Sequence, residues 1–168
     1  MIEQAMNIDE ILSLYADGPV LLEQALSGLP PFALDLPAER GGWTIRQIIH
    51  HITDGDDIWK GFIKRAIGSQ AGEFTLDWYW QIPQDEWASH WAYARRAVEP
   101  SLALLRAGRA HIVQLLEQVP EAWDKCLHIT WPDGREAMVS VRWVVQMQAR
   151  HVAGHVEDIR KIREMHGV

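Results

Sequence analysis

The sequence has little of what disulfide-bonded, membrane-spanning or nucleic-acid-binding proteins need. It contains one cysteine, Cys126, in 168 residues, which excludes an internal disulfide bond and a cluster of thiolate ligands. The formal net charge is −7 and no stretch is strongly basic, so we expect no nucleic-acid partner. No apolar run approaches the roughly 18 residues of a membrane-spanning helix, so we expect no membrane partner.

Signals for export and for several common chemistries are also missing. The first ten residues, MIEQAMNIDE, lack the basic and apolar regions of a secretory signal peptide, so we expect a cytoplasmic protein. The chain has no P-loop, no G-x-G-x-x-G and no G-x-S-x-G motif, which leaves nucleotide binding and serine-hydrolase chemistry without support. No internal repeat or low-complexity tract divides it, and its length suits one domain over residues 1–168.

Hydrophobic periodicity predicts long helical segments at both ends of the chain and between them. The first, residues 9–26, contains Asp17-Gly18-Pro19, which we expect to kink or interrupt it. The second begins at Thr44, a good N-cap, and runs to about residue 67, where GSQAG (68–72) ends it.

The second half of the chain adds two helical regions and a hairpin. The third region, residues 85–119, is expected in two pieces around Pro100, and the last helix runs from Ser140 to about Met165. Between them, KCLHITWPDGREAMVS (125–140) alternates in polarity and turns at PDG, which predicts a short β-hairpin. The expected fold is all-α: a four-helix bundle with a short β-hairpin before the last helix.

Tryptophan is the unusual residue, with nine copies against three phenylalanines and three tyrosines. A loop expected at residues 68–85 has TLDWYWQIP near its centre, and loops of this length are often functional lids. Two interpretations stay open for the tryptophans in and after this loop: they wall a cavity, or they pack between helices. These are Trp78, Trp80, Trp87 and Trp91.

Two histidines stand one helical turn apart in ARHVAGHVEDI (149–159). Placing residues at 100° intervals puts His151 and His155 inside the apolar arc of the last helix, and leaves Arg150 and Glu157 outside it. On the second helix the same construction puts His51 at the edge of the apolar arc. It puts His50 on the polar face, so His50 is predicted to be solvated.

Three inward histidines on two helices favour a metal site. Imidazole suits Zn, Ni, Fe and Cu, and three protein ligands leave positions open for water or substrate. Polar side chains beside these histidines are candidates to fix the imidazole tautomers, and they are Gln47, Asp54, Gln148 and Asp158. The alternative is a metal-free bundle whose histidines are hydrogen-bonded core residues.

The remaining histidines and the cysteine are weaker candidates for catalytic or metal-binding roles. His90, His111, His128 and His166 are predicted to be surface or interface residues. Cys126, at the start of the first hairpin strand, is expected to be a small buried hydrophobe and not a nucleophile.

Two stretches together carry a family resemblance: GGWTIRQIIHHITDGD (41–56) and, about a hundred residues later, QARHVAGHVEDI (148–159). The chain resembles the DinB superfamily, and specifically its YfiT-like branch. The resemblance implies a four-helix bundle with up-down-down-up connectivity and a Zn or Ni ion bound by His51, His151 and His155. It also implies a homodimer. That branch usually carries more histidines beside the terminal pair, where this chain has Arg150 and Val152.

The resemblance also frames the function. Characterised relatives include thiol-dependent transferases and isomerases that use bacillithiol, mycothiol or glutathione, and others are named metal-dependent hydrolases. We therefore expect a metal-dependent enzyme, a transferase using a low-molecular-weight thiol or a hydrolase, acting on a small-molecule substrate. Asp54 is a candidate to accept a proton or orient a ligand, and the alternative is a solvated carboxylate on the edge of the helix. The alternative is a non-catalytic, stress-related metal-binding bundle in which the ion joins two helices.

Overall fold

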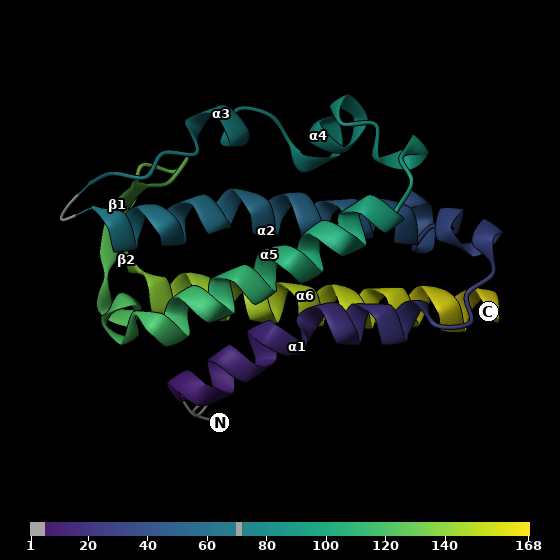
Figure 1. The fold of residues 1–168 in the computed structure, drawn as a ribbon. Helices are drawn as coiled ribbons and strands as arrows, with labels where there is room; N and C mark the ends of the chain where they lie inside the picture. The colour runs from purple at the N-terminus through teal and green to yellow at the C-terminus, as the bar shows by residue number, and fades with distance from the viewer. Residues whose placement is uncertain (1–5, 70–71) are drawn as a thin grey trace, which may run out of the picture.

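The computed structural model describes residues 6–69 and 72–168, and four long helices form its body (Figure 1). They are α1 (Ile8–Leu26), α2 (Ile45–Gly68), α5 (Glu99–Gln118) and α6 (Val141–His166). Helices α1 and α6 run in one direction and α2 and α5 in the other, so the connectivity is up-down-down-up (Figure 1). Helix α1 packs against α6 and α5, and α2 packs against the same two helices. The predicted all-α bundle is confirmed.

The helix starts follow from capping residues that the sequence displays. The Thr44 side chain accepts a hydrogen bond from the Gln47 amide, and the Gln47 side chain accepts one from the Thr44 amide, which caps α2 reciprocally. Ser140 accepts from the Trp143 amide at the start of α6. Helix α2 ends at Gly68; Gln70 and Ala71, which belong to the stretch predicted to end it, lie outside the described residues.

Helix α1 continues through the Asp17-Gly18-Pro19 tripeptide instead of being interrupted there, although its axis changes direction near its middle (Figure 1). A proline cannot donate to the carbonyl four residues before it, which here is that of Tyr15. The buried Arg109 of α5 donates to this carbonyl at 2.8 Å from Nη1. The freed acceptor is therefore satisfied from another helix, and the bundle tolerates the proline.

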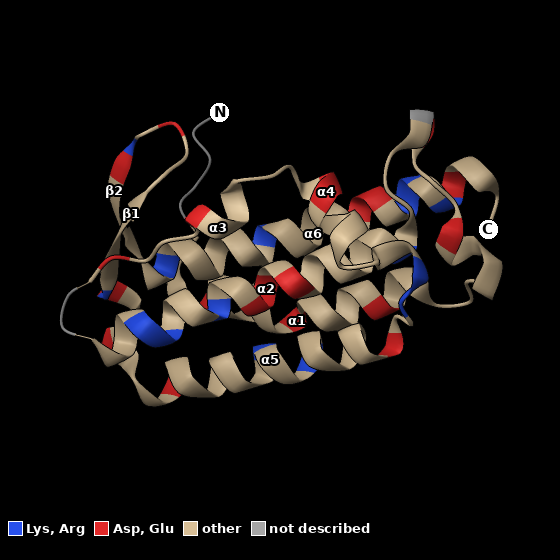
Figure 2. Cartoon of the chain, turned by 90° about the horizontal axis from the view of Figure 1, so that it is seen from above, with Lys and Arg blue, Asp and Glu red and all other residues tan. Residues whose placement is uncertain are grey.

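A long connection between α2 and α5 makes these two helices parallel. Residues 72–98, here called the strap, run back along the length of α2 and carry α3 (Asp77–Trp80), α4 (Gln84–His90) and the 3-10 turn η3 (Tyr93–Arg95) (Figures 1 and 2). The loop expected at 68–85 thus contains a short helix. The predicted break at Pro100 is wrong in position, because the chain breaks over residues 91–98 and Pro100 lies in the first turn of α5.

The predicted hairpin is confirmed, with β1 (Cys126–Thr130) antiparallel to β2 (Glu136–Ser140) and Cys126 opposite Ser140. Gly134 closes the turn with a φ of 79°, a conformation that suits glycine. The start of the strap runs along the other edge of β1, where the Phe74 amide donates to the His128 carbonyl at 2.9 Å. Three further 3-10 segments complete the fold: η1 (Pro31–Asp35), η2 (Glu39–Gly41) and η4 (Pro120–Asp124).

A polar layer crosses the bundle between two apolar clusters of the core. At its centre the fully buried Arg109 guanidinium lies 2.7 Å from Asp56 Oδ1, measured from Nη2. The same Nη2 donates to the Gln148 carbonyl at 2.9 Å. One buried side chain thereby joins α1, α2, α5 and α6. Two of the candidate histidines, His151 and His155, lie on α6.

Charged residues of both signs are interspersed along the outer faces of the helices (Figure 2). Within residues 6–69 and 72–168, none of the helices combines the length and the apolar character that crossing a membrane would require.

Candidate metal centre

Three histidines from two helices meet at the edge of the polar layer. His51 comes from the second turn of α2, and His151 and His155 come from consecutive turns of α6. Each offers one ligand nitrogen, and these atoms all lie within 4.8 Å of one another. His51 is 6 % exposed and the other two are partly buried. The three residues that the sequence singled out are therefore brought together.

The arrangement of the rings suits a metal ion. The Nε2 atom of His151 lies 3.0 Å from Nε2 of His51 and 3.2 Å from Nε2 of His155. The rings stand nearly perpendicular, at 76° to 88°. A tetrahedral Zn²⁺ with Zn–N bonds of about 2.05 Å places its ligand nitrogens about 3.3 Å apart. A hydrogen bond between two of these Nε2 atoms would require one of them to carry the proton and the other a lone pair, so the rings would need different tautomers. One metal ion can instead bind the lone pairs of all three Nε2 atoms.

Burial keeps these imidazoles neutral. Desolvation, followed by the proximity of His151 and His155, lowers the pKa of His51 to about 3. Desolvation, followed by the neighbouring His155, lowers the pKa of His151 to about 4. The pKa of His155 is also lowered by burial, although Asp158 acts in the opposite direction. Neutral imidazole is the form that binds a metal, so at pH 7 no proton has to leave first.

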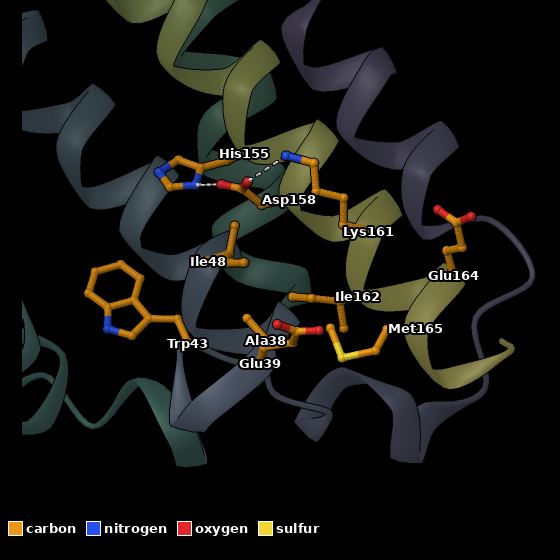
Figure 3. Close-up of a pocket in the computed structure, with 10 residues that line it drawn as sticks. All are labelled: Ala38, Glu39, Trp43, Ile48, His155, Asp158, Lys161, Ile162, Glu164 and Met165. Atoms are coloured by element: carbon orange, nitrogen blue, oxygen red, sulfur yellow. Dashed lines mark hydrogen bonds and ion pairs between the residues drawn. The ribbon is translucent and has the colours of Figure 1, made fainter.

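Asp158 orients His155 from one turn further along α6. Its Oδ2 lies 3.1 Å from Nδ1 of His155, which places the proton on Nδ1 and leaves Nε2 free for the ion. Lys161 lies 3.9 Å from the other carboxylate oxygen of Asp158 (Figure 3). One of the side chains predicted to fix a tautomer therefore makes the contact directly.

A groove of about 680 Å³ opens beside His155, here called the outer groove (Figure 3). Its apolar wall comes from the segment before α2, from α2 itself and from the end of α6, and its charged side chains lie on both flanks. The lining residues are Ala38, Glu39, Trp43, Ile48, His155, Asp158, Lys161, Ile162, Glu164 and Met165. Sequence reasoning missed this groove, because its walls come from segments more than a hundred residues apart.

A second, smaller space borders the other two histidines. This inner cavity has a volume of about 210 Å³, and His51 and His151 line it together with Gln148 of α6. Tyr79 and Gln84 of the strap also line it. Two spaces of different size therefore border the histidine cluster.

The sequence matches a known family over most of the chain. A sequence profile of the DinB superfamily matches residues 15–159, a range that includes all three histidines. The chain belongs to the DinB superfamily. The resemblance in GGWTIRQIIHHITDGD and QARHVAGHVEDI is thereby confirmed at the level of the family.

Relatives within the DinB superfamily carry a name that points to metal chemistry. A protein from Geobacillus kaustophilus is 27 % identical over 165 residues, covering 98 % of this chain and 88 % of the relative. One from Geobacillus thermodenitrificans is 24 % identical over 164 residues with the same coverage, and one from Bacillus cereus is 26 % identical over 155 residues, covering 92 % and 86 %. Each is named "Putative metal-dependent hydrolase".

A solved structure shares the fold of this DinB protein. YfiT from Bacillus subtilis superimposes with a TM-score of 0.82 at 18 % identity, covering 99 % of this chain and 93 % of that one. It is described as "a probable metal-dependent hydrolase with an unusual four-helix bundle topology". At this identity the likeness shows the fold, which agrees with the up-down-down-up order of the helices.

Asp54, predicted to act as a base or to orient a ligand, is not one of the residues whose ligand atoms converge with the histidines. Its Oδ2 accepts from Nη1 of Arg96 at 3.3 Å. After burial, the charge of Asp54 and its hydrogen bond with Tyr93 are the causes that raise the pKa of that tyrosine. In this structure Asp54 holds the strap to α2, and its catalytic role stays a prediction.

The prediction that His50 is solvated is wrong. His50 is fully buried, with Nδ1 2.8 Å from Oγ of Ser101 and Nε2 3.3 Å from the Arg96 carbonyl. The helical wheel assigned this face to solvent, but α5 and the strap both cover it. Desolvation lowers the pKa of His50.

The aromatic residues either pack against one another or line the spaces beside the histidines. In the strap, Tyr79 stacks on Trp87 and Trp91, with ring centroids 5.8 and 6.3 Å apart, and Trp78 meets Trp87 at 5.6 Å. Trp80 instead packs on Trp131 of the hairpin turn. None of the four tryptophans singled out in the sequence lines either space beside the histidines. The packing interpretation therefore holds for them.

Trp43 is the tryptophan that reaches the site. It stands edge-on to His51 at a centroid distance of 4.6 Å and also lines the outer groove. The sequence signal for it was its place two residues before α2, next to the Thr44 cap. A residue at that position can cover the first turn of the helix from outside.

The other candidates of the sequence lie away from the cluster. His90, His111 and His166 are exposed, as predicted, while His128 is partly buried in β1. Gln47 caps α2 and does not orient a histidine. Cys126 is partly buried and its thiol donates to the Asp124 carbonyl at 3.4 Å.

Proposed function

We propose that this DinB-superfamily protein is a metal-dependent hydrolase that binds a divalent ion, Zn²⁺ or Ni²⁺, through His51, His151 and His155. The observation that carries the proposal is the convergence of three neutral Nε2 atoms beside a groove large enough for a small molecule. The names of the relatives support the same class of chemistry.

The donor set fits a catalytic ion better than a purely structural one. Structural zinc sites are closed by four protein ligands, whereas three histidines leave a coordination position open. No fourth histidine, cysteine or carboxylate joins the group within the part of the chain that the structure describes. When bound, such an ion lowers the pKa of a coordinated water and polarises a substrate carbonyl.

The chain's own residues would bind the substrate and exclude water. Trp43, Ile48 and Ile162 offer an apolar wall for the body of a small molecule in the outer groove. Asp158 keeps the proton of His155 on Nδ1, so that Nε2 faces the ion. Trp43 covers the edge of His51 and shields this ligand from solvent.

A thiol-dependent transferase is the second candidate, and the two spaces beside the histidines favour it. Transfer to a low-molecular-weight thiol needs room for both the thiol and its electrophilic partner. The outer groove borders His155, and the inner cavity borders His51 and His151. The homodimer implied by the resemblance and the cytoplasmic location expected from the first ten residues remain proposals of the same standing.

The test combines metal content with activity. Untagged wild type and the variants His51→Ala and His155→Ala are analysed for bound metal by elemental mass spectrometry, with His111→Ala as the control because His111 is exposed on α5. We expect about one ion per chain in the wild type and the control, and little in the other two. Ester, amide and thiol-transfer substrates are then tested with and without metal. A wild type that stays metal-free after reconstitution would contradict the proposal.

A further inference from the structure

Two buried polar atoms of neighbouring α6 residues have no partner. They are Nδ1 of His151 and Oε1 of Gln148, and they are the two such side-chain atoms found among the described residues. Residues three apart on a helix lie on one face, and both of these side chains line the inner cavity. Gln148 is 2 % exposed, so bulk water does not reach it.

The unpartnered atoms are complementary in type. With Nε2 of His151 facing the other two histidines, its proton lies on Nδ1, which becomes a donor. The Gln148 amide nitrogen already donates to the Gly55 carbonyl at 3.4 Å, which fixes Oε1 as the acceptor. A buried donor and a buried acceptor left unpaired both destabilise the folded protein.

The inner cavity is large enough to hold a water molecule that would pair the two atoms. One water occupies about 30 Å³ of liquid volume, and a buried water needs two to four polar partners. The cavity of about 210 Å³ exceeds that volume, and both residues line it. A single O–H group can accept from Nδ1 of His151 and donate to Oε1 of Gln148.

We propose that Gln148 is a positioning residue for the metal centre: it holds His151 in the Nδ1–H tautomer through a water bound in the inner cavity. Asp158 does the same for His155 by a direct hydrogen bond. The two histidine ligands of α6 are therefore oriented differently, one by a carboxylate and the other through a water. This inference rests on the proposed metal site. The carboxylate at His155 is half exposed, whereas the amide at His151 is buried, where a neutral side chain avoids the desolvation of a charge.

Zinc affinity of three variants tests the proposal. Gln148→Met keeps the shape but removes the acceptor, and we expect its Zn²⁺ dissociation constant to rise about 10- to 100-fold. Gln148→Glu keeps an acceptor oxygen and loses the amide that donates to Gly55, so its affinity should stay within about threefold of the wild type. Met147→Leu, which alters the same cavity wall without a polar change, is the control and should also stay near the wild type.

The readouts are chelator competition with Zn²⁺ and thermal unfolding of the metal-free proteins. Loss of the Gly55 contact alone would lower the unfolding temperature of both Gln148 variants and weaken zinc equally in both, which would overturn the proposal. Unchanged affinity in Gln148→Met would also overturn it, while leaving the metal site intact. A wild type that binds no zinc would overturn both.

A high-resolution crystal structure of the zinc-loaded wild type supplies a test that needs no variant. We expect an ordered water within about 3.2 Å of both His151 Nδ1 and Gln148 Oε1. A dry inner cavity, or Nδ1 bonded to another group, would overturn the proposal even if every variant failed to fold.

Discussion

At the scale of single residues, the position of a side chain in the site can be predicted where the pattern of its own helix determines it. It cannot be predicted where contacts with a neighbouring element determine it. The faces of His151 and His155 follow from the apolar arc of α6, and Asp158 lies three residues from His155, within reach along the same helix. The first residue-scale prediction concerns this carboxylate.

Asp158→Ala should weaken Zn²⁺ binding about tenfold, at the low end of such effects because the carboxylate is half exposed. The His155 ring loses the acceptor that holds its tautomer, while the fold keeps its core. Chelator competition measures the affinity. Glu157→Ala, which removes an exposed neighbouring carboxylate paired with Arg160, is the matched control and should leave zinc affinity unchanged. Equal weakening in both variants would mean that general negative charge is responsible.

Gly18 gives a second residue-scale prediction. A Cβ built there would lie 2.3 Å from Nη1 of Arg109, which cannot retreat because it is fully buried and bonded to the Tyr15 carbonyl. Gly18→Ala should therefore cost about 1–3 kcal/mol of stability. Gly154→Ala on α6, where no atom lies within 4 Å, should be neutral or stabilise by up to about 1 kcal/mol. Urea unfolding of both variants checks this; a neutral Gly18→Ala would refute the close approach.

His50 shows why such predictions fail. A helical wheel treats each helix as having one buried face, but α2 is covered by α6, by α5 and by the strap. The partners of His50, Ser101 and the Arg96 carbonyl, lie about fifty residues later in the chain. Nothing in the local pattern of α2 reveals them, so the residue was placed in solvent.

At the scale of elements, caps and periodicity predicted α2, α6 and the hairpin because their signals are local. In the strap, residues 72–84 were predicted as a loop although they contain α3, and α4 was predicted as the start of a long helical region. Those helices are short, and their aromatic residues stack on one another, while α4 packs on η3 and η3 packs on α2. Contacts of this kind are decided by the fold and not by periodicity.

The strap should therefore respond to loss of one internal contact. Nε1 of Trp87 donates to the Tyr79 carbonyl at 2.7 Å, which ties α4 to α3. Trp87→Phe removes this donor, and we expect faster amide hydrogen exchange in residues 77–95 while α2 and α6 exchange as before. Trp78→Phe is the control, because it reduces a ring of the same aromatic cluster without removing the hydrogen bond between Trp87 and Tyr79. Exchange that rises throughout the molecule would show that the strap is not a separate unit of stability.

At the scale of the whole molecule, the buried Arg109 links the proline in α1 to the helix that carries two of the ligands. Its guanidinium contacts Asp56, the Tyr15 carbonyl and the Gln148 carbonyl, and it lies 4.2 Å from the Tyr15 ring centroid. Sequence patterns did not reveal this layer, because an arginine in an amphipathic helix is normally expected outside.

Arg109→Met should cost about 3–5 kcal/mol, since it leaves the Asp56 carboxylate buried without its partner. Adding Asp56→Leu removes that stranded charge, so the double variant should be more stable than Arg109→Met alone, though below the wild type because the Tyr15 and Gln148 carbonyls stay unpaired. A double-mutant cycle in urea measures the coupling. Additive losses would mean that the ion pair is not what holds the layer. A large coupling would identify the Arg109–Asp56 pair as the contact that stabilises the polar layer and, through it, the packing of the four helices.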